Sequence, residues 1–406
     1  MSFNNFSLRP ELLKAIEALN FNEPTPVQKE SIPAVLAGHD VLVSAQTGTG
    51  KTLAFVLPVL HRMLEKPLPG VTGLVLLPTR ELAAQVAQVA KEAGRFTHIR
   101  TALLVGGESF LPQLQALRGG ASLVIATPGR LLDHLERRTI SLASVHTLIL
   151  DEADRMLDMG FAPALHAILR YVPAERQTML FSATLPSEIT RLTHLALKNP
   201  VRIQMAIQGA TADSITQMLY PVMRNQKSDL LLGILRNTSM NAVLIFCRTK
   251  RGADRLARFL QAEDFSVVPL HADRTQAQRN AALQGFKTGR YRICVATDIA
   301  ARGLDVRKLS HVINFDVPER TEDYVHRIGR TGRHFEVGDA YTLVSPDEER
   351  YVAAIERFIG RKLPRVQLPD FPYEKLPPPV KPKTYMEMFG TRRRRFIPRN
   401  RFARFR

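Results

Sequence analysis

The chain contains 406 residues, more than a single ordinary hydrophobic core accommodates, so we expect two domains with extensions. Its formal net charge of +18 predicts a polyanionic partner, either a nucleic acid or an anionic membrane surface. Two cysteines exclude a disulfide framework, and the sequence shows neither a signal-peptide pattern nor an apolar run of membrane-spanning length. We therefore expect a soluble, cytoplasmic protein in which Cys247 and Cys294 are reduced and buried.

The first expected helix covers residues 8–19, where leucine and isoleucine recur at helical spacing. A proline-rich turn over residues 21–28 follows and ends at Gln28. The amide of Gln28 has a donor and an acceptor face, so it could pair with the edge of an adenine. A solvated loop residue is the alternative interpretation.

A short apolar strand is expected at residues 41–44, followed by Ala-Gln-Thr-Gly-Thr-Gly-Lys-Thr at residues 45–52 and then a helix. This segment matches the phosphate-loop pattern G-x-x-x-x-G-K-[ST], except that Ala45 replaces the first glycine. In such a loop Lys51 reaches the β and γ phosphates, and Thr52 offers a hydroxyl to Mg²⁺. A glycine-rich turn between a strand and a helix is the structural alternative.

Further apolar strands alternate with helical stretches, which predicts an α/β fold with parallel sheets and helices on both faces. The first series of expected strands covers residues 74–77, 102–105, 123–126, 148–150 and 178–181. The sequence turns irregular at residues 201–214, where we expect an interdomain linker. A second series of strands follows at residues 243–247, 265–270, 292–296, 311–315 and 340–344, with no second phosphate loop.

Two adjacent carboxylates, Asp151 and Glu152, follow one of these buried strands and so reach the carboxyl edge of the sheet, where α/β proteins bind ligands. One carboxylate can face Mg²⁺ while the other polarises a water molecule. Other strand ends supply hydroxyls, backbone N–H groups or an arginine, which suits contact with a phosphate–sugar backbone but also describes ordinary turns and helix caps. These loops cover residues 78–81, 106–107, 127–130 and 182–184.

The second half carries three arginines within seven residues, in the segment 326–333. They could form a solvated basic face. However, the phosphate loop in the first half has no obvious arginine to offset charge on the γ-phosphate, and such an arginine accelerates phosphoryl transfer by about 10³ to 10⁵. Arginines of one domain acting on ATP in the other would make hydrolysis depend on domain closure.

With these residues assembled, the chain resembles the DEAD-box RNA helicases of superfamily 2, most closely the bacterial RhlE type. The likeness covers roughly residues 1–365, and Asp-Glu-Ala-Asp at residues 151–154 is the family's name motif. It implies two tandem RecA-like domains, at residues 1–205 and 216–365 with a linker at 206–215, and a disordered basic tail at 366–406. ATP with Mg²⁺ would lie between the domains, and RNA would lie across both.

The resemblance also implies roles for residues around ATP. Adenine recognition falls to Phe21 and Gln28, with an upstream aromatic at Phe3. The phosphate loop comprises Ala45, Gln46, Thr47, Gly48, Thr49, Gly50, Lys51 and Thr52, and the second domain adds Gly303 and Asp305. Mg²⁺ would be held by Thr52 and by Asp151, largely through water. Catalysis falls to Lys51, Asp151, Glu152, Arg330 and Arg333, the last two as arginine fingers.

The remaining implied roles concern RNA. Contacts with the RNA backbone fall to Thr79, Arg80, Gly107, Thr127, Arg130, Arg248 and Thr297. Coupling between ATP hydrolysis and strand separation falls to Asp154, Ser182, Thr184 and His326. Gln276 and Arg279 match a further pair in the family's pattern.

The tail is rich in proline and then interleaves arginine with phenylalanine. Residues 361–406 carry 14 Lys/Arg and three Asp/Glu, so most of the chain's net charge lies there. Arginine with aromatic residues suits RNA phosphates and unpaired bases, whereas a merely solubilising tail is the alternative.

We expect an ATP-dependent RNA helicase that hydrolyses ATP when RNA is bound and opens short duplexes locally or remodels ribonucleoprotein. Its partners would be single-stranded and short duplex RNA, with ribosome-assembly or RNA-decay complexes as candidates. An ATP-gated RNA clamp or RNA-annealing chaperone is the alternative, and a DNA helicase is a third interpretation.

Overall fold

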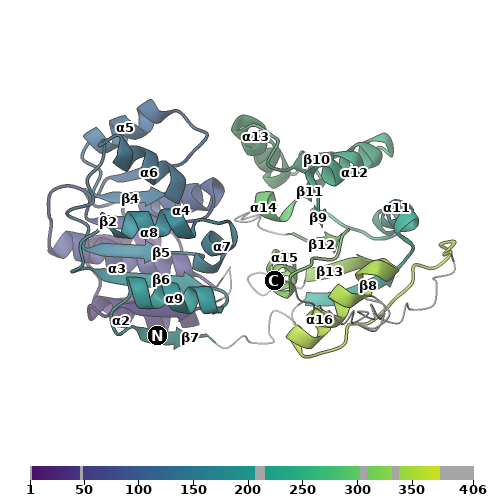
Figure 1. The fold of residues 1–406 in the computed structure, drawn as a ribbon, viewed down its shortest axis with the longest axis horizontal. Helices are drawn as coiled ribbons and strands as arrows, with labels where there is room; N and C mark the ends of the chain where they lie inside the picture. The colour runs from purple at the N-terminus through teal and green to yellow at the C-terminus, as the bar shows by residue number, and fades with distance from the viewer. Residues whose placement is uncertain (1, 46–48, 206–214, 302–308, 332–337, 375–406) are drawn as a thin grey trace, which may run out of the picture.

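The computed structural model describes residues 2–45, 49–205, 215–301, 309–331 and 338–374, without the side chain of Ile299. The expected tail beyond residue 374 and most of the expected linker lie outside these ranges. Two α/β units lie side by side, the N-terminal one in purple to teal and the C-terminal one in green to yellow (Figure 1). We call them domain 1 and domain 2.

Domain 1 contains a seven-stranded sheet in the order β3-β4-β2-β5-β6-β1-β7, and every pair in it is parallel. The strands are β1 Val41–Ser44, β2 Gly73–Leu76, β3 Thr101–Leu104, β4 Leu123–Ala126, β5 Thr147–Leu150, β6 Gln177–Ser182 and β7 Val201–Gln204. In β5, Ile149 packs into one hydrophobic cluster, while Leu148 and Leu150 pack into another on the opposite face. The sheet is therefore covered on both faces, as its continuous apolar strands predict.

The helices of domain 1 precede β1 or connect consecutive strands, and they cover the two faces. After the short 3-10 helix η1 Phe3–Phe6 they are α1 Pro10–Ala18, α2 Pro26–Leu36, α3 Lys51–Glu65, α4 Arg80–Ala93, α5 Phe110–Arg118, α6 Pro128–Glu136, α7 Ala153–Asp158, α8 Ala162–Leu169 and α9 Ser187–Ala196. α2 begins after Thr25, whose backbone N–H donates to Oε1 of Gln28 in the first turn at 2.9 Å.

Domain 2 contains a six-stranded parallel sheet in the order β10-β11-β9-β12-β13-β8. Its strands are β8 Ile215–Pro221, β9 Val243–Phe246, β10 Val267–Leu270, β11 Ile293–Ala296, β12 His311–Asn314 and β13 Gly338–Val344. Its helices are α11 Lys227–Asn237, α12 Lys250–Ala262, α13 Gln276–Lys287, α14 Asp298–Ala301, α15 Thr321–Ile328 and α16 Glu349–Ile359, with 3-10 turns η2 Arg224–Gln226 and η3 Pro346–Glu348. The prediction of two parallel-sheet α/β domains is confirmed.

The expected strands occur, but the sheets also contain two strands that we did not predict. β7 and β8 lie at the edges of their sheets, on either side of the linker. In β7 only Ile203 is buried, and β8 alternates buried and exposed residues, so neither gives the continuous apolar signal of the central strands. Strand structure therefore occupies positions 201–204, which we had expected to be irregular, and β8 begins at Ile215, inside the expected linker.

The packed part of domain 2 extends beyond residue 365, where we had placed the start of the tail. The backbone N–H of Val366 donates to the carbonyl of Leu219 in β8 at 2.9 Å. Leu368, Phe371 and Tyr373 pack against the domain 2 core. The side chain of Gln226 donates to the carbonyl of Pro372 at 2.8 Å, so this C-terminal segment is held against the domain.

Cys247 and Cys294 are free and buried, as expected. Burial raises the pKa of the Cys294 thiol to about 12, which keeps it protonated at neutral pH. Within the described part of the chain, no helix combines the length and apolar character needed to cross a lipid bilayer.

Candidate nucleotide and RNA site between the domains

The carboxyl ends of all seven strands of domain 1 meet at one edge of the sheet, because all strand pairs are parallel. Strand order then separates the expected site residues into two groups. The RNA-contact candidates Gly107, Thr127 and Thr79 follow β3, β4 and β2, which are neighbours at one side. The ATP candidates follow β5 and β1, with the coupling residues after β6 between them.

The phosphate loop joins β1 to α3. Gly50 precedes the helix with φ of 90°, a left-handed conformation that favours glycine. Lys51 is buried, and its Nζ donates to the carbonyl of Ala45 at 2.8 Å across the loop. Gln46, Thr47 and Gly48 lie outside the described residues. The described part of the loop thus holds Lys51 at the N-terminus of α3, where phosphate binds in such loops.

Gln28 contacts this loop directly. Its Nε2 donates to the carbonyl of Gly50 at 2.9 Å, and its Oε1 accepts from the backbone N–H of Thr25 at 2.9 Å. An amide nitrogen has a second hydrogen and an amide oxygen a second lone pair, so these contacts leave capacity for an adenine edge. The residue that we assigned to adenine recognition therefore also positions the end of the phosphate loop.

The two aromatic residues that we linked to adenine differ in exposure. Phe21 has 43% of its surface exposed, so its ring can stack with a base. Phe3 is only 4% exposed and packs edge-on against Phe6, with ring centroids 6.0 Å apart. Phe3 is a core residue in this structure, and Phe21 offers the open ring.

Asp151 and Glu152 are both buried at the end of β5, but their environments differ. Burial raises the pKa of Asp151 to about 6, against the attraction of Lys51. Burial also favours a higher pKa for Glu152, but attraction to Arg155, Lys51 and Arg330 outweighs it and lowers the pKa below its usual value. Glu152 is therefore a charged carboxylate held by cations from both domains.

The donor set suits Mg²⁺ bound together with phosphate. Thr52 and Asp151 are hard oxygen donors, and the raised pKa of Asp151 shows a buried carboxylate whose charge is incompletely balanced by protein groups. Among the described residues, no group of three or more His, Cys, Asp or Glu is placed to hold a metal ion. Mg²⁺ usually has only one or two protein ligands, and phosphate oxygens and water molecules complete its coordination.

Asp154 joins this site to the loop after β6. Its Oδ2 accepts hydrogen bonds from the backbone N–H of Ala183 at 3.1 Å and of Thr184 at 3.0 Å, and from the Thr184 hydroxyl at 3.1 Å. Ser182 in turn donates its hydroxyl to the carbonyl of Thr184 at 2.6 Å. The three coupling candidates of domain 1 therefore form one connected hydrogen-bond network.

Arg155 is a site residue that sequence reasoning missed. It is 2% exposed, and its Nη1 donates to Glu152 Oε2 at 2.5 Å. Glu152 adopts a left-handed φ of 52° before α7, which brings the two side chains together. The position of Arg155 directly after the Asp-Glu-Ala-Asp motif could have indicated this role, but we considered only the acidic residues of that segment.

The arginines of the segment 326–333 have different surroundings in domain 2. Arg327 is 3% exposed and pairs with Asp298 through Nε at 2.6 Å and Nη2 at 2.8 Å, so it supports the domain internally. Arg330 lies close enough to Glu152 to lower that residue's pKa. His326 and Arg330 line a small cavity between the domains together with Arg155. Arg333, Gly303 and Asp305 lie outside the described residues.

Two of the RNA-contact candidates in domain 1 lie against each other. A Cβ added at Gly107, which has φ of 71°, would lie 1.8 Å from Nη1 of Arg80. Only glycine, which has no Cβ, leaves room for the Arg80 guanidinium at position 107. Thr79 caps α4 through its hydroxyl, and Arg130 donates two bonds to the carbonyl of Glu108, at 3.3 and 3.2 Å.

The RNA-contact candidates of domain 2 follow β9 and β11, at the carboxyl edge of that sheet. Arg248 Nη2 donates to Glu348 Oε1 at 3.2 Å, and its side chain remains 37% exposed. Thr297 precedes α14 and is partly buried.

Side chains of α4 and α13, and the pair Arg320 and Asp158, join the domains beside this site. Arg279 Nη2 lies 2.8 Å from Glu81 Oε1, and Arg80 Nη1 donates to Gln276 Oε1 at 3.2 Å. Arg320 pairs with Asp158. The resemblance to the family identified Gln276 and Arg279 but gave them no function. In the structure both contact the first turn of α4.

Comparison with known proteins agrees with this architecture. Residues 25–192 match the family DEAD/DEAH box helicase, and residues 226–335 match the family Helicase conserved C-terminal domain. The DEAD-box ATP-dependent RNA helicases CshA of Bacillus licheniformis and Bacillus subtilis are each 42% identical to this chain over 369 residues. These alignments cover 91% of the chain and 76% and 74% of the two relatives.

Solved structures are similar across both domains. Dbp5 of S. cerevisiae bound to RNA and ADP BeF3 superposes with a TM-score of 0.83 at 31% identity, covering 91% of this chain and 96% of that one. A DEAD box protein from Methanococcus jannaschii is 36% identical over 90% of this chain and 99% of its own, with a TM-score of 0.53. From its fold, its motifs and these relatives, the chain belongs to the family of DEAD-box ATP-dependent RNA helicases.

Proposed function

We propose that this ATP-dependent RNA helicase hydrolyses ATP only when its two domains close, and that Glu152 is the residue at which closure is sensed. Glu152 is buried and charged beside Lys51 and Arg155 of domain 1 and Arg330 of domain 2. This single observation carries the proposal, because a carboxylate under the influence of both domains changes its environment when they separate.

In this mechanism Glu152 accepts a proton from a water molecule. The water oxygen then bonds to the γ-phosphorus as the bond from that phosphorus to the β–γ bridging oxygen breaks, releasing ADP and inorganic phosphate. Lys51 and Arg330 supply positive charge near the phosphates, and removing an arginine of this type lowers the rate by about 10³ to 10⁵ in related systems. Thr52 and Asp151 would hold Mg²⁺, largely through water, and the bound ion would supply further positive charge beside the phosphates.

The RNA in this proposal lies across the carboxyl edges of both sheets. The candidates Thr79, Arg80, Gly107, Thr127 and Arg130 lie at that edge in domain 1, and Arg248 and Thr297 in domain 2. The overall arrangement of the chain matches Dbp5 bound to RNA and ADP BeF3, which supports an RNA-binding, closed state. The network from Asp154 to Ser182 and Thr184 would carry the change from the ATP site to RNA, with His326 on the domain 2 side.

Unwinding by this mechanism is local. Stacking in a nucleic-acid duplex contributes about 1.4 kcal/mol per step, so one closure cannot open a helix of several turns. We infer short duplexes or ribonucleoproteins as substrates. Assignment to the RhlE type, a cytoplasmic location and association with ribosome-assembly or RNA-decay complexes are also our proposals. Free, buried cysteines are compatible with the reducing cytoplasm.

An ATP-gated RNA clamp or annealing chaperone would use the same closed state without needing turnover. Multiple-turnover unwinding of a short RNA duplex, compared between the wild type and Glu152→Gln, distinguishes the two functions. We expect the variant to bind ATP and RNA but to lose repeated unwinding. Equal unwinding by both proteins over many turnovers would make catalytic cycling irrelevant and favour the clamp.

A further inference from the structure

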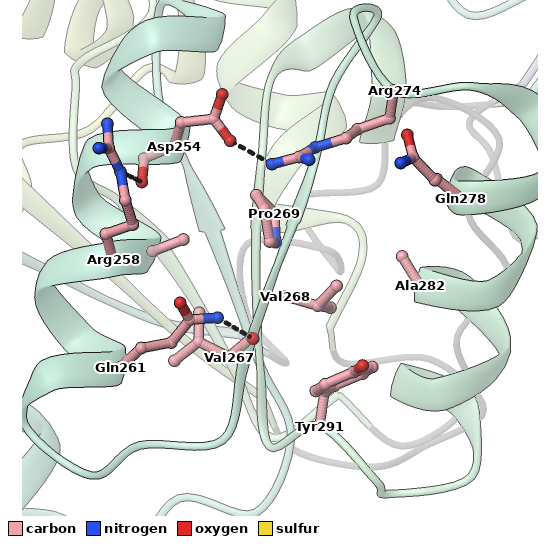
Figure 2. Close-up of a pocket in the computed structure, with 11 residues that line it drawn as sticks. Asp254, Arg258, Gln261, Val267, Val268, Pro269, Arg274, Gln278, Ala282 and Tyr291 are labelled. Atoms are coloured by element: carbon pink, nitrogen blue, oxygen red, sulfur yellow. Dashed lines mark hydrogen bonds and ion pairs between the residues drawn. The ribbon is translucent and has the colours of Figure 1, made fainter.

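A groove of about 540 Å³ runs along the outer edge of β10 in domain 2, between α12 and α13 (Figure 2). Val268, Pro269 and Tyr291 form its apolar floor. Its volume falls within the range of small-molecule binding sites. None of the ATP or RNA candidates lines it, so it is separate from the site between the domains.

The edge of β10 is poorly suited to pairing with another strand. Ser266 and Leu270 direct their carbonyls to β11, so the backbone groups of Val267 and Pro269 point outward to the groove. Gln261 Nε2 already donates to the Val267 carbonyl at 3.0 Å, and Pro269 has no N–H to offer. An occupant of the groove must therefore be recognised by side chains rather than by strand addition.

The walls of the groove carry positive charge. Arg258 projects from α12, and Arg274 lies at the upper end. The one carboxylate in the lining, Asp254, is already engaged by Arg274 Nη2 at 2.6 Å and by His271 Nε2 at 3.0 Å. The Asp254 contact uses Nη2 of Arg274 and leaves its buried Nε without a partner among the described residues, so an anionic group would meet Arg258 and this N–H while its apolar neighbours cover the floor.

We propose that this groove docks a short peptide of a partner protein that alternates acidic and aliphatic side chains. Its carboxylates would pair with Arg258 and accept from Nε of Arg274, whose Nη2 stays on Asp254, and its aliphatic side chains would cover Val268, Pro269 and Tyr291. RNA fits less well, because nucleic-acid contacts go mostly to phosphate and sugar oxygens. Arg258 and Arg274 could meet phosphates as well as carboxylates, but the apolar floor of Val268 and Pro269 is matched only by aliphatic side chains.

The groove adjoins the helix that contacts domain 1. Gln278 lines the groove and also completes the capping box of α13 with Thr275. Gln276 and Arg279, in the same turn, contact Arg80 and Glu81 of domain 1. A docked peptide would therefore lie against the helix turn that joins the two domains.

The test begins with a random ten-residue peptide library displayed on phage and selected on the full chain. The enriched peptide, labelled with fluorescein, is then titrated by fluorescence anisotropy against the wild type and two charge-reversed variants. Arg258→Glu changes the groove, and Arg357→Glu is the matched control, because Arg357 is an exposed residue of α16 outside the groove. Both variants alter the net charge by the same amount.

We expect the enriched peptides to be acidic and aliphatic, with affinity at least tenfold lower for Arg258→Glu and unchanged for Arg357→Glu. Thermal unfolding of both variants checks that each remains folded. The proposal is wrong if no peptide is enriched, if enriched peptides lack acidic residues, or if the two variants bind the peptide equally. Loss of affinity for a ten-nucleotide uridine RNA in Arg258→Glu but not in Arg357→Glu would instead assign the groove to RNA.

Discussion

Arg279 in domain 2 lies with its Nη2 2.8 Å from Oε1 of Glu81 in domain 1, and the two side chains are 15% and 9% exposed. The same Glu81 oxygen accepts a hydrogen bond from Gln276 Nε2 at 3.3 Å. This is a largely buried charged contact that exists only when the domains meet. Its strength should therefore set part of the free energy of domain closure.

Replacing Glu81 with glutamine removes the charge that faces Arg279 while keeping the side-chain shape. Leaving a largely buried charge without its partner costs about 1–3 kcal/mol, so we expect a closure equilibrium weakened at least fivefold. The measurement is RNA-stimulated ATPase as a function of RNA concentration, in which the RNA concentration at half-maximal rate should rise. A double-mutant cycle with Arg279→Ala should show the two effects to be non-additive.

The ion pair between Arg320 and Asp158 provides the matched comparison. It also joins the two domains, but its side chains are 59% and 41% exposed. Exposed pairs contribute about 0–1 kcal/mol and weaken with salt. Arg320→Ala should consequently change RNA-stimulated ATPase much less than Glu81→Gln, and an equal or larger effect would contradict our ranking of the two contacts.

Substitution of Gly50 by alanine should weaken ATP binding specifically. A Cβ at Gly50 would lie 2.7 Å from Nε2 of Gln28, so the amide must move away from the phosphate loop. Removing one such hydrogen bond costs roughly 1 kcal/mol, which corresponds to about a fivefold rise in the Kd for ATP. ATP affinity of the variant, measured by calorimetry, checks this expectation.

Gly38→Ala is the control for backbone strain at Gly50. Gly38 also has a positive φ, of 88°, but the nearest atom to its added Cβ is 3.6 Å away. Both variants should lose stability through the left-handed backbone, by about 1–2 kcal/mol. Only Gly50→Ala should lose ATP affinity, and a similar loss in Gly38→Ala would mean that strain alone explains the result.

Gly107→Ala should disturb RNA binding through Arg80. The added Cβ would overlap the guanidinium, which must leave Gly107 and with it the hydrogen bond to Gln276. The adjacent Gly106→Ala places its Cβ no closer than 3.7 Å to Arg80, so it should be nearly neutral. RNA affinity in the presence of a non-hydrolysable ATP analogue distinguishes them, and equal affinities would show that the position of Arg80 does not matter.

Removal of residues 385–406 should reduce the salt dependence of RNA binding. That segment carries eight arginines, and each RNA phosphate that the protein no longer neutralises lowers the slope of log affinity against log salt by about 0.7 for single strands. ATPase activity at saturating RNA should persist, since the two domains remain intact. An unchanged slope in the truncated protein would refute an RNA-binding role for the tail.

The sequence by itself determined the fold class, the two-domain organisation and the family. Central parallel strands are buried on both faces, so their apolar runs are continuous and readable, and the ATP and RNA motifs follow them at recognisable spacing. Edge strands such as β7 expose most of their side chains and escaped prediction for that reason.

Only the tertiary structure decided which of these residues meet. Arg80 and Gln276 are 196 positions apart, and no periodicity relates residues across two separately folded domains. The contact of Arg155 with Glu152 depends on a left-handed turn at a residue other than glycine, which local pattern does not predict. The regular spacing of the arginines also did not distinguish Arg327 from Arg330. Arg327 pairs with Asp298 inside domain 2, whereas Arg330 lowers the pKa of Glu152 in domain 1. Burial and contact assign those roles: the contacts of Arg155 and Arg327 arise when each domain folds, and those of Arg80 and Arg330 only where the two domains meet.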